Sequence, residues 1–309
     1  MKKIAFIFPG QGSQSLGMGK DFFEQSDIAK NMVSSATARL GIDFEKLLFE
    51  ENDLLEQTEF TQPAILLISS IATKILQEKC NITPVFALGH SLGEISALVS
   101  VGALDYLDGI ELVHNRGLFM KNACEGKNAA MMALLGLSDD VVEKICEEQR
   151  VQGKLIWAAN YNIDGQLVLA GARNDLESCV DVFKSAGAKR AIVLNMSVAS
   201  HCPMLEEAVE NLGEIASKFL KDDFIAPVIS NATCKKYNSK SEAIELLKAQ
   251  LTKPVLYKQS IAAFENEIDL FIELGNGSVL KGLNKKSSKP TLSINNMASL
   301  NESIEAING

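Results

Sequence analysis

One stretch of the sequence decides how the chain folds, and it reads Val85-Phe86-Ala87-Leu88-Gly89-His90-Ser91-Leu92-Gly93-Glu94-Ile95. Its first four residues are apolar and predict a buried strand, whereas the segment from Leu92 to Val101 has the pattern of a helix. The residues Gly89 to Gly93 at the junction form a G-x-S-x-G sequence. A strand, a tight turn and a helix in this order are typical of an α/β protein with a parallel sheet.

Ser91 in this turn is a candidate nucleophile. Glycines on both sides let the backbone approach neighbouring strands, and the serine hydroxyl projects at the N-terminus of the helix. Free N–H groups at a helix N-terminus can hold a developing oxyanion. An ordinary turn with a capping serine would show the same residues, but the complete order of strand, turn and helix favours the nucleophile.

Two other apolar runs predict further strands of the same sheet. Ile4–Phe8 and Leu270–Leu274 are each followed within two residues by glycine. The second run leads into a helical pattern over Val279–Lys286. The repetition of strand and helix therefore predicts an α/β fold.

The middle of the chain has a different order of elements: strand, helix, strand, strand, helix, strand. This βαββαβ order is that of a ferredoxin-like unit, and Asp164-Gly165 is a turn signal between its middle strands. We predict a large α/β domain of residues 1–127 and 198–309, with a ferredoxin-like subdomain of residues 128–197 inserted into it. A ligand is expected in the cleft between them. The expected strands are Ala129–Leu135, Leu155–Asn160, Gln166–Ala170 and Arg190–Leu194, and the expected helices are Asp139–Arg150 and Leu176–Ala186.

The composition limits the classes of function. With 309 residues, 47% hydrophobic and 22% charged, the chain matches a compact protein of about two domains. A net charge of -9 is the wrong sign for a protein that binds nucleic acid, and no uncharged run reaches the roughly 20 apolar residues of a membrane helix. The six cysteines form no C-x-x-C pair, which predicts neither a disulfide framework nor a zinc site and suits a reducing cytoplasm.

A serine nucleophile needs a base, and the chain contains three histidines, His90, His114 and His201. His90 adjoins Ser91 at the end of a strand, so alternation should point it away from the serine. His114 lies on a predicted helix and is more simply a surface or core residue. His201 remains as the base. It precedes a helix that Pro203 would start, and a helix N-terminus disfavours the protonated imidazole.

Arg116 lies on the apolar face of a helix predicted over Asp105–Cys124. A guanidinium there needs a partner, and two are open: an internal acidic residue, or the carboxylate of a substrate, which the planar fork of arginine binds well. The loop Pro9–Gln14 after the first strand fails both nucleotide-binding patterns. It can supply backbone N–H groups to an anion, and a plain structural turn is an equal alternative.

The segments that stand out, in chain order, are Pro9–Gln14, Gly89–Glu94, Arg116, Ser200-His201, Ala249–Val255 and Glu273–Gly277. Together they resemble the malonyl-CoA:acyl carrier protein transacylases, from Phe8 to about Leu283. The resemblance implies a hydrolase-like α/β domain that carries a ferredoxin-like subdomain. It also implies a ping-pong transfer of malonyl from malonyl-CoA to the phosphopantetheine thiol of acyl carrier protein for fatty acid biosynthesis, without a metal or a prosthetic group.

The resemblance also implies a role for individual residues. The backbone carbonyl of Gln250, in place of an acid, is expected to orient the base. His90, directly before Ser91, is a further candidate for substrate binding. The set is Ser91 as nucleophile, His201 as base, the backbone N–H groups of Gln11 and Leu92 as oxyanion hole, and Arg116, Gln250 and His90 as substrate-binding residues, with Arg116 on the malonate carboxylate.

Two other functions stay open. A serine thioesterase or esterase shares the G-x-S-x-G turn and the oxyanion hole, although it usually has an acid between serine and histidine in the chain. A non-catalytic module that binds acyl carrier protein would never be acylated at Ser91. For the acyl group, Val198-Ala199-Ser200-His201 is closer to the methylmalonyl pattern of polyketide relatives. Stand-alone malonyl enzymes also commonly carry serine before the histidine, so malonyl is preferred and methylmalonyl stays an alternative.

An acidic carrier protein would need a basic surface on this acidic chain. The basic clusters are Lys189-Arg190, Lys235-Lys236, and Lys285-Lys286 with Lys289. At least one of them is expected to border the entrance to Ser91.

Overall fold

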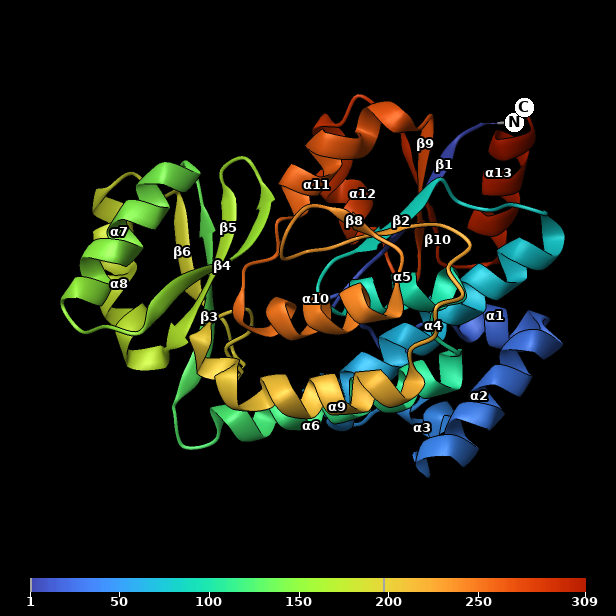
Figure 1. Cartoon of the computed structure of the whole chain (residues 1–309), viewed down its shortest axis with the longest axis horizontal. Helices are drawn as coiled ribbons and strands as arrows, with labels where there is room; N and C mark the ends of the chain where they lie inside the picture. Colours follow the sequence, from blue (N-terminus) through green and yellow to red (C-terminus); the bar gives the residue numbers. More distant parts are fainter. Residues whose placement is uncertain (1, 197) are drawn as a thin grey trace.

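The computed structural model of the chain describes residues 2–196 and 198–309, and the strands within them form two separate sheets (Figure 1). The larger sheet has the strand order β10-β9-β1-β2-β7-β8 and the smaller one β4-β5-β3-β6. The strands are β1 (Ile4–Phe8), β2 (Phe86–Gly89), β3 (Ala129–Leu135), β4 (Ile156–Ile163), β5 (Gln166–Ala172), β6 (Arg190–Val193), β7 (Val228–Ile229), β8 (Lys236–Tyr237), β9 (Leu270–Leu274) and β10 (Thr291–Ile294).

The helices that surround the sheets are α1 (Lys20–Gln25), α2 (Asp27–Leu40), α3 (Phe44–Phe49), α4 (Thr58–Lys79), α5 (Leu92–Ser100), α6 (Tyr106–Cys124), α7 (Asp139–Val151), α8 (Arg173–Ser185), α9 (Val209–Phe219), α10 (Lys240–Thr252), α11 (Tyr257–Phe264), α12 (Val279–Leu283) and α13 (Met297–Asn308). Short 3-10 helices are η1 (Leu54–Glu56), η2 (Pro203–Ala208), η3 (Glu265–Glu267) and η4 (Asn284–Lys286). None of the described helices combines the length and the apolar character that crossing a bilayer requires.

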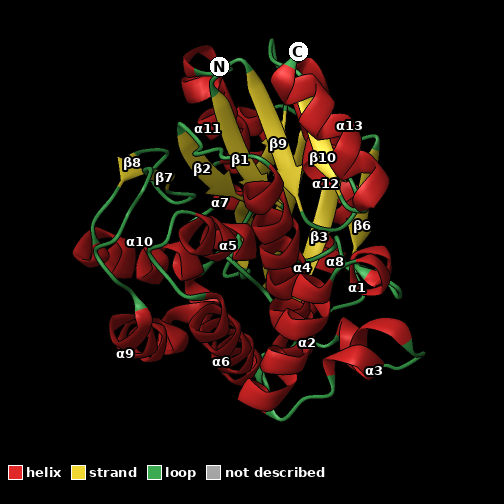
Figure 2. Cartoon of the chain, turned by 90° about the vertical axis from the view of Figure 1, so that its right-hand side faces the viewer, coloured by secondary structure: helices red, strands yellow, loops and turns green. Residues whose placement is uncertain are grey.

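Parallel pairing joins β10, β9, β1, β2 and β7, whereas β8 at the edge is antiparallel to β7. β1 lies inside the sheet, and its five residues are all apolar and buried, as expected for a strand covered on both faces. Ala5 and Ile7 belong to the core that contains residues of α11 and α12, and Phe6 and Phe8 belong to the core that contains residues of α4 and α5. Figure 2 shows helices on both sides of this sheet.

The smaller sheet is antiparallel throughout, and α7 and α8 pack on it with a core of their own (Figure 1). The βαββαβ order is therefore confirmed, and so is the turn at Asp164-Gly165, where Gly165 has a φ of 78°. The domain limits at 127/128 and 197/198 stay a prediction, and Ser197 lies outside the described residues.

The chain after α10 connects the two sheets. The Tyr161 N–H of β4 donates to the Val255 carbonyl at 2.9 Å, and the Val255 N–H donates to the Ala159 carbonyl at 2.8 Å. Lys258 at the start of α11 forms ion pairs with Asp139 and Asp164 of the small subdomain. These contacts hold the edge of the small sheet beside the segment that carries Gln250.

Most of the expected elements agree with the structure to within a few residues. The strands at 4–8, 129–135 and 270–274 have the predicted bounds, and helix α5 begins at Leu92. One prediction was wrong: Pro203 begins the 3-10 helix η2, and the α-helix α9 starts only at Val209. A proline at the first position suits either kind of helix, so the local sequence does not distinguish them.

Candidate active site

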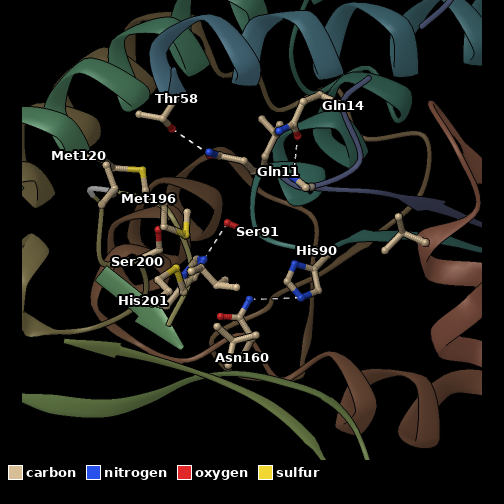
Figure 3. A pocket seen from close by; sticks show the side chains of 18 of the residues that line it. Gln11, Gln14, Thr58, His90, Ser91, Met120, Asn160, Met196, Ser200 and His201 are labelled. Carbon is tan, nitrogen blue, oxygen red and sulfur yellow. Dashed lines mark hydrogen bonds between the residues drawn. The ribbon is translucent and has the colours of Figure 1, made fainter. Parts of the chain in front are cut away.

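Ser91 occupies the turn between β2 and α5 in a conformation that residues other than glycine rarely adopt, with φ 54° and ψ -109°. Such a backbone costs about 1–3 kcal/mol and persists because its surroundings hold it. The Ser91 N–H donates to Asn231 Oδ1 at 2.7 Å, and the His90 N–H donates to the Phe8 carbonyl at 3.0 Å. The turn thereby presents the serine hydroxyl to a cavity (Figure 3).

The two glycines of the G-x-S-x-G sequence are required by close packing. A Cβ atom on Gly93 would lie 2.0 Å from the Phe8 carbonyl oxygen of β1. A Cβ atom on Gly89 would lie 2.0 Å from the carbonyl carbon of Gly93. The helix can therefore begin directly over the two central strands only because both positions lack a side chain.

A Gly93→Ala variant should lose about 3 kcal/mol of unfolding free energy, the upper part of the range for overpacked sites, because the clash is with backbone that cannot rotate away. Chemical denaturation measures the change. Gly282→Ala in α12 is the matched control, since no atom lies within 4 Å of its added Cβ. Equal stability of the two variants would contradict the packing argument.

His201 lies against the serine although 110 residues separate them. Its Nδ1 is 2.7 Å from the Gln250 backbone carbonyl, which only accepts, so Nδ1 carries the hydrogen. Its Nε2 is 2.7 Å from Ser91 Oγ and is therefore free to accept the serine proton (Figure 3). Burial, aided by the positive charge of Arg116, lowers the pKa of His201 to about 3 and keeps the ring neutral. From the sequence, a neutral His201 was expected because of a helix N-terminus. His201 is neutral because it is buried.

The other two histidines lie elsewhere. His90 Nε2 bonds to Asn162 Oδ1 of β4 at 2.8 Å, and the ring lies against the small subdomain and lines the cavity. Figure 3 shows it turned from Ser91, as alternation predicts. His114 Nδ1 donates to the Glu59 carbonyl at 2.7 Å and is not among the residues that line the cavity. Elimination therefore identified the histidine that contacts the serine.

Arg116 of α6 is 1% exposed, and all three of its hydrogen bonds go to neutral groups. Nη1 donates to Gln62 Oε1 at 2.7 Å, and Nη2 donates to Gln250 Oε1 at 3.1 Å and to Ser91 Oγ at 3.2 Å. Nε is buried without a partner among the described residues. Burial lowers the pKa of Arg116 to about 10, so it stays charged at neutral pH. The direct internal salt bridge considered from the sequence is thus not found in the described part of the chain.

The two predicted oxyanion donors also line the cavity. Leu92 is the first residue of α5, so its N–H has no acceptor within the helix. Gln11 lies in the loop after β1, and its side-chain Oε1 accepts from Thr58 Oγ1 at 2.9 Å, which leads the side chain away from Ser91 (Figure 3). Both backbone N–H groups stay predictions for the oxyanion hole.

The cavity measures about 750 Å³ and lies between the large domain and the small sheet, where a ligand was expected. Asn160, Asn162 and Val168 contribute to it from the small sheet, and Val279 and Leu283 from α12. Its basic lining residues are Arg116, Lys121 and Arg173, and none of the three predicted basic clusters is among them.

Sequence reasoning missed part of the polar shell behind the serine. Glu94 Oε2 accepts from the Asn231 N–H at 2.9 Å and from Gln250 Nε2 at 2.7 Å. Tyr237 OH donates to Glu94 Oε1 at 3.0 Å. An acidic residue in the apolar helix that follows Ser91 was a signal for Glu94, whereas nothing local distinguishes Asn231.

Comparison with known proteins supports a single family. The family described as acyl transferase domain matches residues 5–302. A relative from Bacillus subtilis, named malonyl CoA-acyl carrier protein transacylase, is 40% identical over 94% of this chain and 92% of its own. The crystal structure of malonyl-CoA:acyl carrier protein transacylase from Helicobacter pylori superposes with a TM-score of 0.97 at 46% identity, covering 100% of this chain and 99% of that one.

A third similar structure includes a partner. It is a malonyl-transacylase in complex with its type II PKS acyl-carrier protein, with a TM-score of 0.94, 34% identity and coverage of 98% of this chain and 99% of that one.

Proposed function

The chain belongs to the acyl transferase domain family and, within it, to the malonyl-CoA:acyl carrier protein transacylases, and we propose that Ser91, His201 and Arg116 carry out its transfer of the acyl group. The enzyme is an [acyl-carrier-protein] S-malonyltransferase of fatty acid synthesis, with malonyl-CoA and acyl carrier protein as its substrates. The observation that carries the residue assignment is the contact of Ser91 Oγ with a neutral, oriented imidazole.

In the first half of the reaction, His201 Nε2 takes the proton of Ser91 as Oγ attacks the thioester carbonyl carbon of malonyl-CoA. The carbonyl oxygen becomes an oxyanion that accepts hydrogen bonds from the N–H groups of Gln11 and Leu92. When the intermediate collapses, the C–S bond breaks and the coenzyme A sulfur takes the proton from His201. A malonyl ester of Ser91 remains.

The second half reverses these steps with a new thiol. His201 takes the proton of the carrier's phosphopantetheine thiol, and the sulfur attacks the ester carbonyl. Collapse of this intermediate breaks the bond to Ser91 Oγ, which recovers its proton from His201. The two thioesters are nearly equal in energy, so the acyl-serine has to survive until the second thiol arrives without losing its acyl group to water.

Arg116 is the proposed seat of the malonyl carboxylate. Its unpaired Nε–H is one donor, and its Nη2 bond to Ser91 Oγ is the longest of its three and is the one that acylation disturbs. A carboxylate fits such a site because two parallel charge-assisted hydrogen bonds satisfy both partners. This carboxylate seat favours malonyl over acyl groups that lack a carboxylate.

Brief exposure to malonyl-CoA should give a covalent adduct on the Ser91 peptide, and holo acyl carrier protein should then remove it as malonyl-carrier. Mass spectrometry of the intact protein and of the peptide measures both steps, with methylmalonyl-CoA and acetyl-CoA in parallel to define the acyl range. Release of free malonate in place of malonyl-carrier would identify a thioesterase, and a protein that stays unmodified would identify a non-catalytic binding module.

We also propose that the protein works in the cytoplasm. All six cysteines are unpaired. Unpaired thiols suit a reducing compartment.

A further inference from the structure

Glu94 is a buried carboxylate that the reaction described above does not use. It lies in the first turn of α5, is 0% exposed and is not among the residues that line the cavity. Both of its oxygens accept hydrogen bonds, from Asn231, Gln250 and Tyr237. Each oxygen of this carboxylate therefore has a hydrogen-bond partner, and the carboxylate lies behind the serine, outside the cavity.

The side-chain amide of Gln250 connects this carboxylate to Arg116. Arg116 Nη2 donates to Gln250 Oε1, and Gln250 Nε2 donates to Glu94 Oε2. A guanidinium can only donate and a carboxylate can only accept, so the amide has one possible orientation between them. Glu94 is therefore the counter-ion of Arg116, and the buried side-chain amide of Gln250 bridges the two charges, which are not in direct contact.

The charges in this buried group balance as long as no malonyl carboxylate is present. One guanidinium and one carboxylate are then present, and burial of a net charge is avoided. A malonyl carboxylate on Arg116 adds a second anion, so that two carboxylates face one cation. An acetyl group adds none.

We propose that Glu94 keeps the acyl pocket electrically neutral by binding one proton from the buffer when the malonyl carboxylate occupies Arg116, and by releasing that proton when the malonyl group leaves. This inference rests on the proposed function of Ser91 and Arg116. Glu94 touches no reacting atom and is a positioning residue, since it acts on the substrate through Gln250 and Arg116. It should favour malonyl over acetyl more strongly when it is protonated.

Among the described charged and titratable groups around Glu94, Glu94 is the one whose pKa lies near neutral pH. Burial raises the pKa of Glu94 to about 7 and that of Tyr237 well above 10. It lowers the pKa of Arg116 to about 10. Burial lowers the pKa of His201 to about 3 and lowers that of His90 below its usual 6.5. A protonated Glu94 can donate from Oε1 to the Tyr237 oxygen while Oε2 keeps its two donors, and the Tyr237 O–H then turns away from Glu94.

The sign of the pH effect follows from linkage. A nearby malonyl carboxylate raises the pKa of Glu94, so the malonyl-enzyme holds more protons than the acetyl-enzyme between the two pKa values. Raising the pH through this range therefore disfavours the malonyl-enzyme, by up to about tenfold per pH unit for one proton. Below about pH 7 both forms are protonated at Glu94 and the preference levels off.

The test compares wild-type protein with Glu94→Gln, which resembles the protonated carboxyl group. Its amide oxygen can accept from the Asn231 N–H and from Gln250, and its amide nitrogen can donate to the Tyr237 oxygen. Each protein is equilibrated with malonyl-CoA or acetyl-CoA plus free coenzyme A from pH 6 to 8.5, and mass spectrometry measures the acylated fraction. The ratio of malonyl- to acetyl-enzyme cancels the ionisation of the coenzyme A thiol. Calorimetry in buffers of different ionisation enthalpy measures proton uptake directly.

For the wild type, we expect the ratio of malonyl-enzyme to acetyl-enzyme to fall above neutral pH, and we expect proton uptake on malonylation but not on acetylation. For Glu94→Gln, we expect this ratio to be independent of pH and proton uptake to be the same for malonyl and acetyl. Glu273→Gln changes another buried carboxylate, one held by the N–H groups of Leu280 and Lys281, and should keep the wild-type slope.

A flat wild-type ratio, or a slope that persists in Glu94→Gln, would overturn the inference while leaving the proposed function intact. Absence of any Ser91 adduct at every pH would instead overturn the proposed function. If Glu94→Gln does not fold, the calorimetry of the wild type is the test: proton uptake on malonylation supports the inference, and its absence overturns it.

Discussion

Replacing Ser91 by alanine should abolish the covalent malonyl adduct, and replacing His201 by alanine should slow its formation by about 10²–10⁴-fold, the usual effect of losing a general base. The reason is the 2.7 Å contact between Ser91 Oγ and His201 Nε2, with Nδ1 held by a carbonyl. Without the imidazole, the serine hydroxyl has no described neighbour that can take its proton. Rapid quench followed by mass spectrometry measures the single-turnover rate.

His114→Ala is the matched control, because this histidine is partly buried but does not line the cavity. It should acylate at the wild-type rate. An adduct that persists on the Ser91→Ala protein would place the nucleophile at another residue. Because burial holds the pKa of His201 at about 3, a loss of rate between pH 6 and 7 in the wild type would not arise from this imidazole.

Arg116→Ala should lose most malonyl transfer yet retain or gain activity with acetyl-CoA. A site built to pair a polar substrate group rejects an analogue that lacks it by roughly 10⁴-fold, and hydrogen bonds to charged groups contribute about 1.5–3 kcal/mol each. With acetyl bound, the buried guanidinium keeps its unpaired Nε, whereas a carboxylate satisfies it. The alanine variant removes this buried charge and leaves the contact between Ser91 and His201 in place.

Arg116→Lys should restore malonyl transfer only in part. One ammonium cannot serve Gln62, Gln250 and a carboxylate with the planar geometry of the guanidinium. The measurement is kcat/KM for malonyl-CoA and acetyl-CoA on each variant, with a thermal melt to establish folding.

Arg173→Ala is the control for this series, since Arg173 lines the cavity and contacts the Met196 carbonyl but is not bonded to Ser91. It should affect both coenzyme A esters alike and keep their ratio. If a folded Arg116→Ala protein kept the wild-type malonyl to acetyl ratio, Arg116 would be a structural residue and the specificity argument would fail.

Local patterns predicted most of the fold because the strands in question are short, apolar and bounded by glycine or a turn. β1, β3 and β9 have the predicted bounds, and the small antiparallel sheet has the order expected from its elements. The exception was the segment after His201, where a proline start did not distinguish a 3-10 helix from an α-helix. Short 3-10 segments are frequent at the N-terminus of an α-helix, and here η2 leads directly into α9.

The candidate site divides in the same way. The turn around Ser91 was visible in the sequence because its strain, its glycines and its helix are all contained in a few consecutive residues. His201 and Arg116 were candidates by residue type, by elimination and by resemblance to a family. Nothing in the local pattern predicted that, among the described residues, the hydrogen-bond partners of Arg116 are all neutral.

Residues that are neighbours in the chain were thus enough to predict an α/β fold, the strand-turn-helix around Ser91 and a short list of chemically suitable side chains. Which of these side chains contact one another depends on packing between distant segments. His201, Gln250 and Asn231 lie more than 100 positions from the serine they hold. Their bonds of 2.7 to 3.1 Å exist because α10 and the segments next to η2 and β7 pack around the turn between β2 and α5. The burial that keeps His201 neutral and raises the pKa of Glu94 to about 7 arises from the same packing, since it removes water from groups that the sequence shows only as polar.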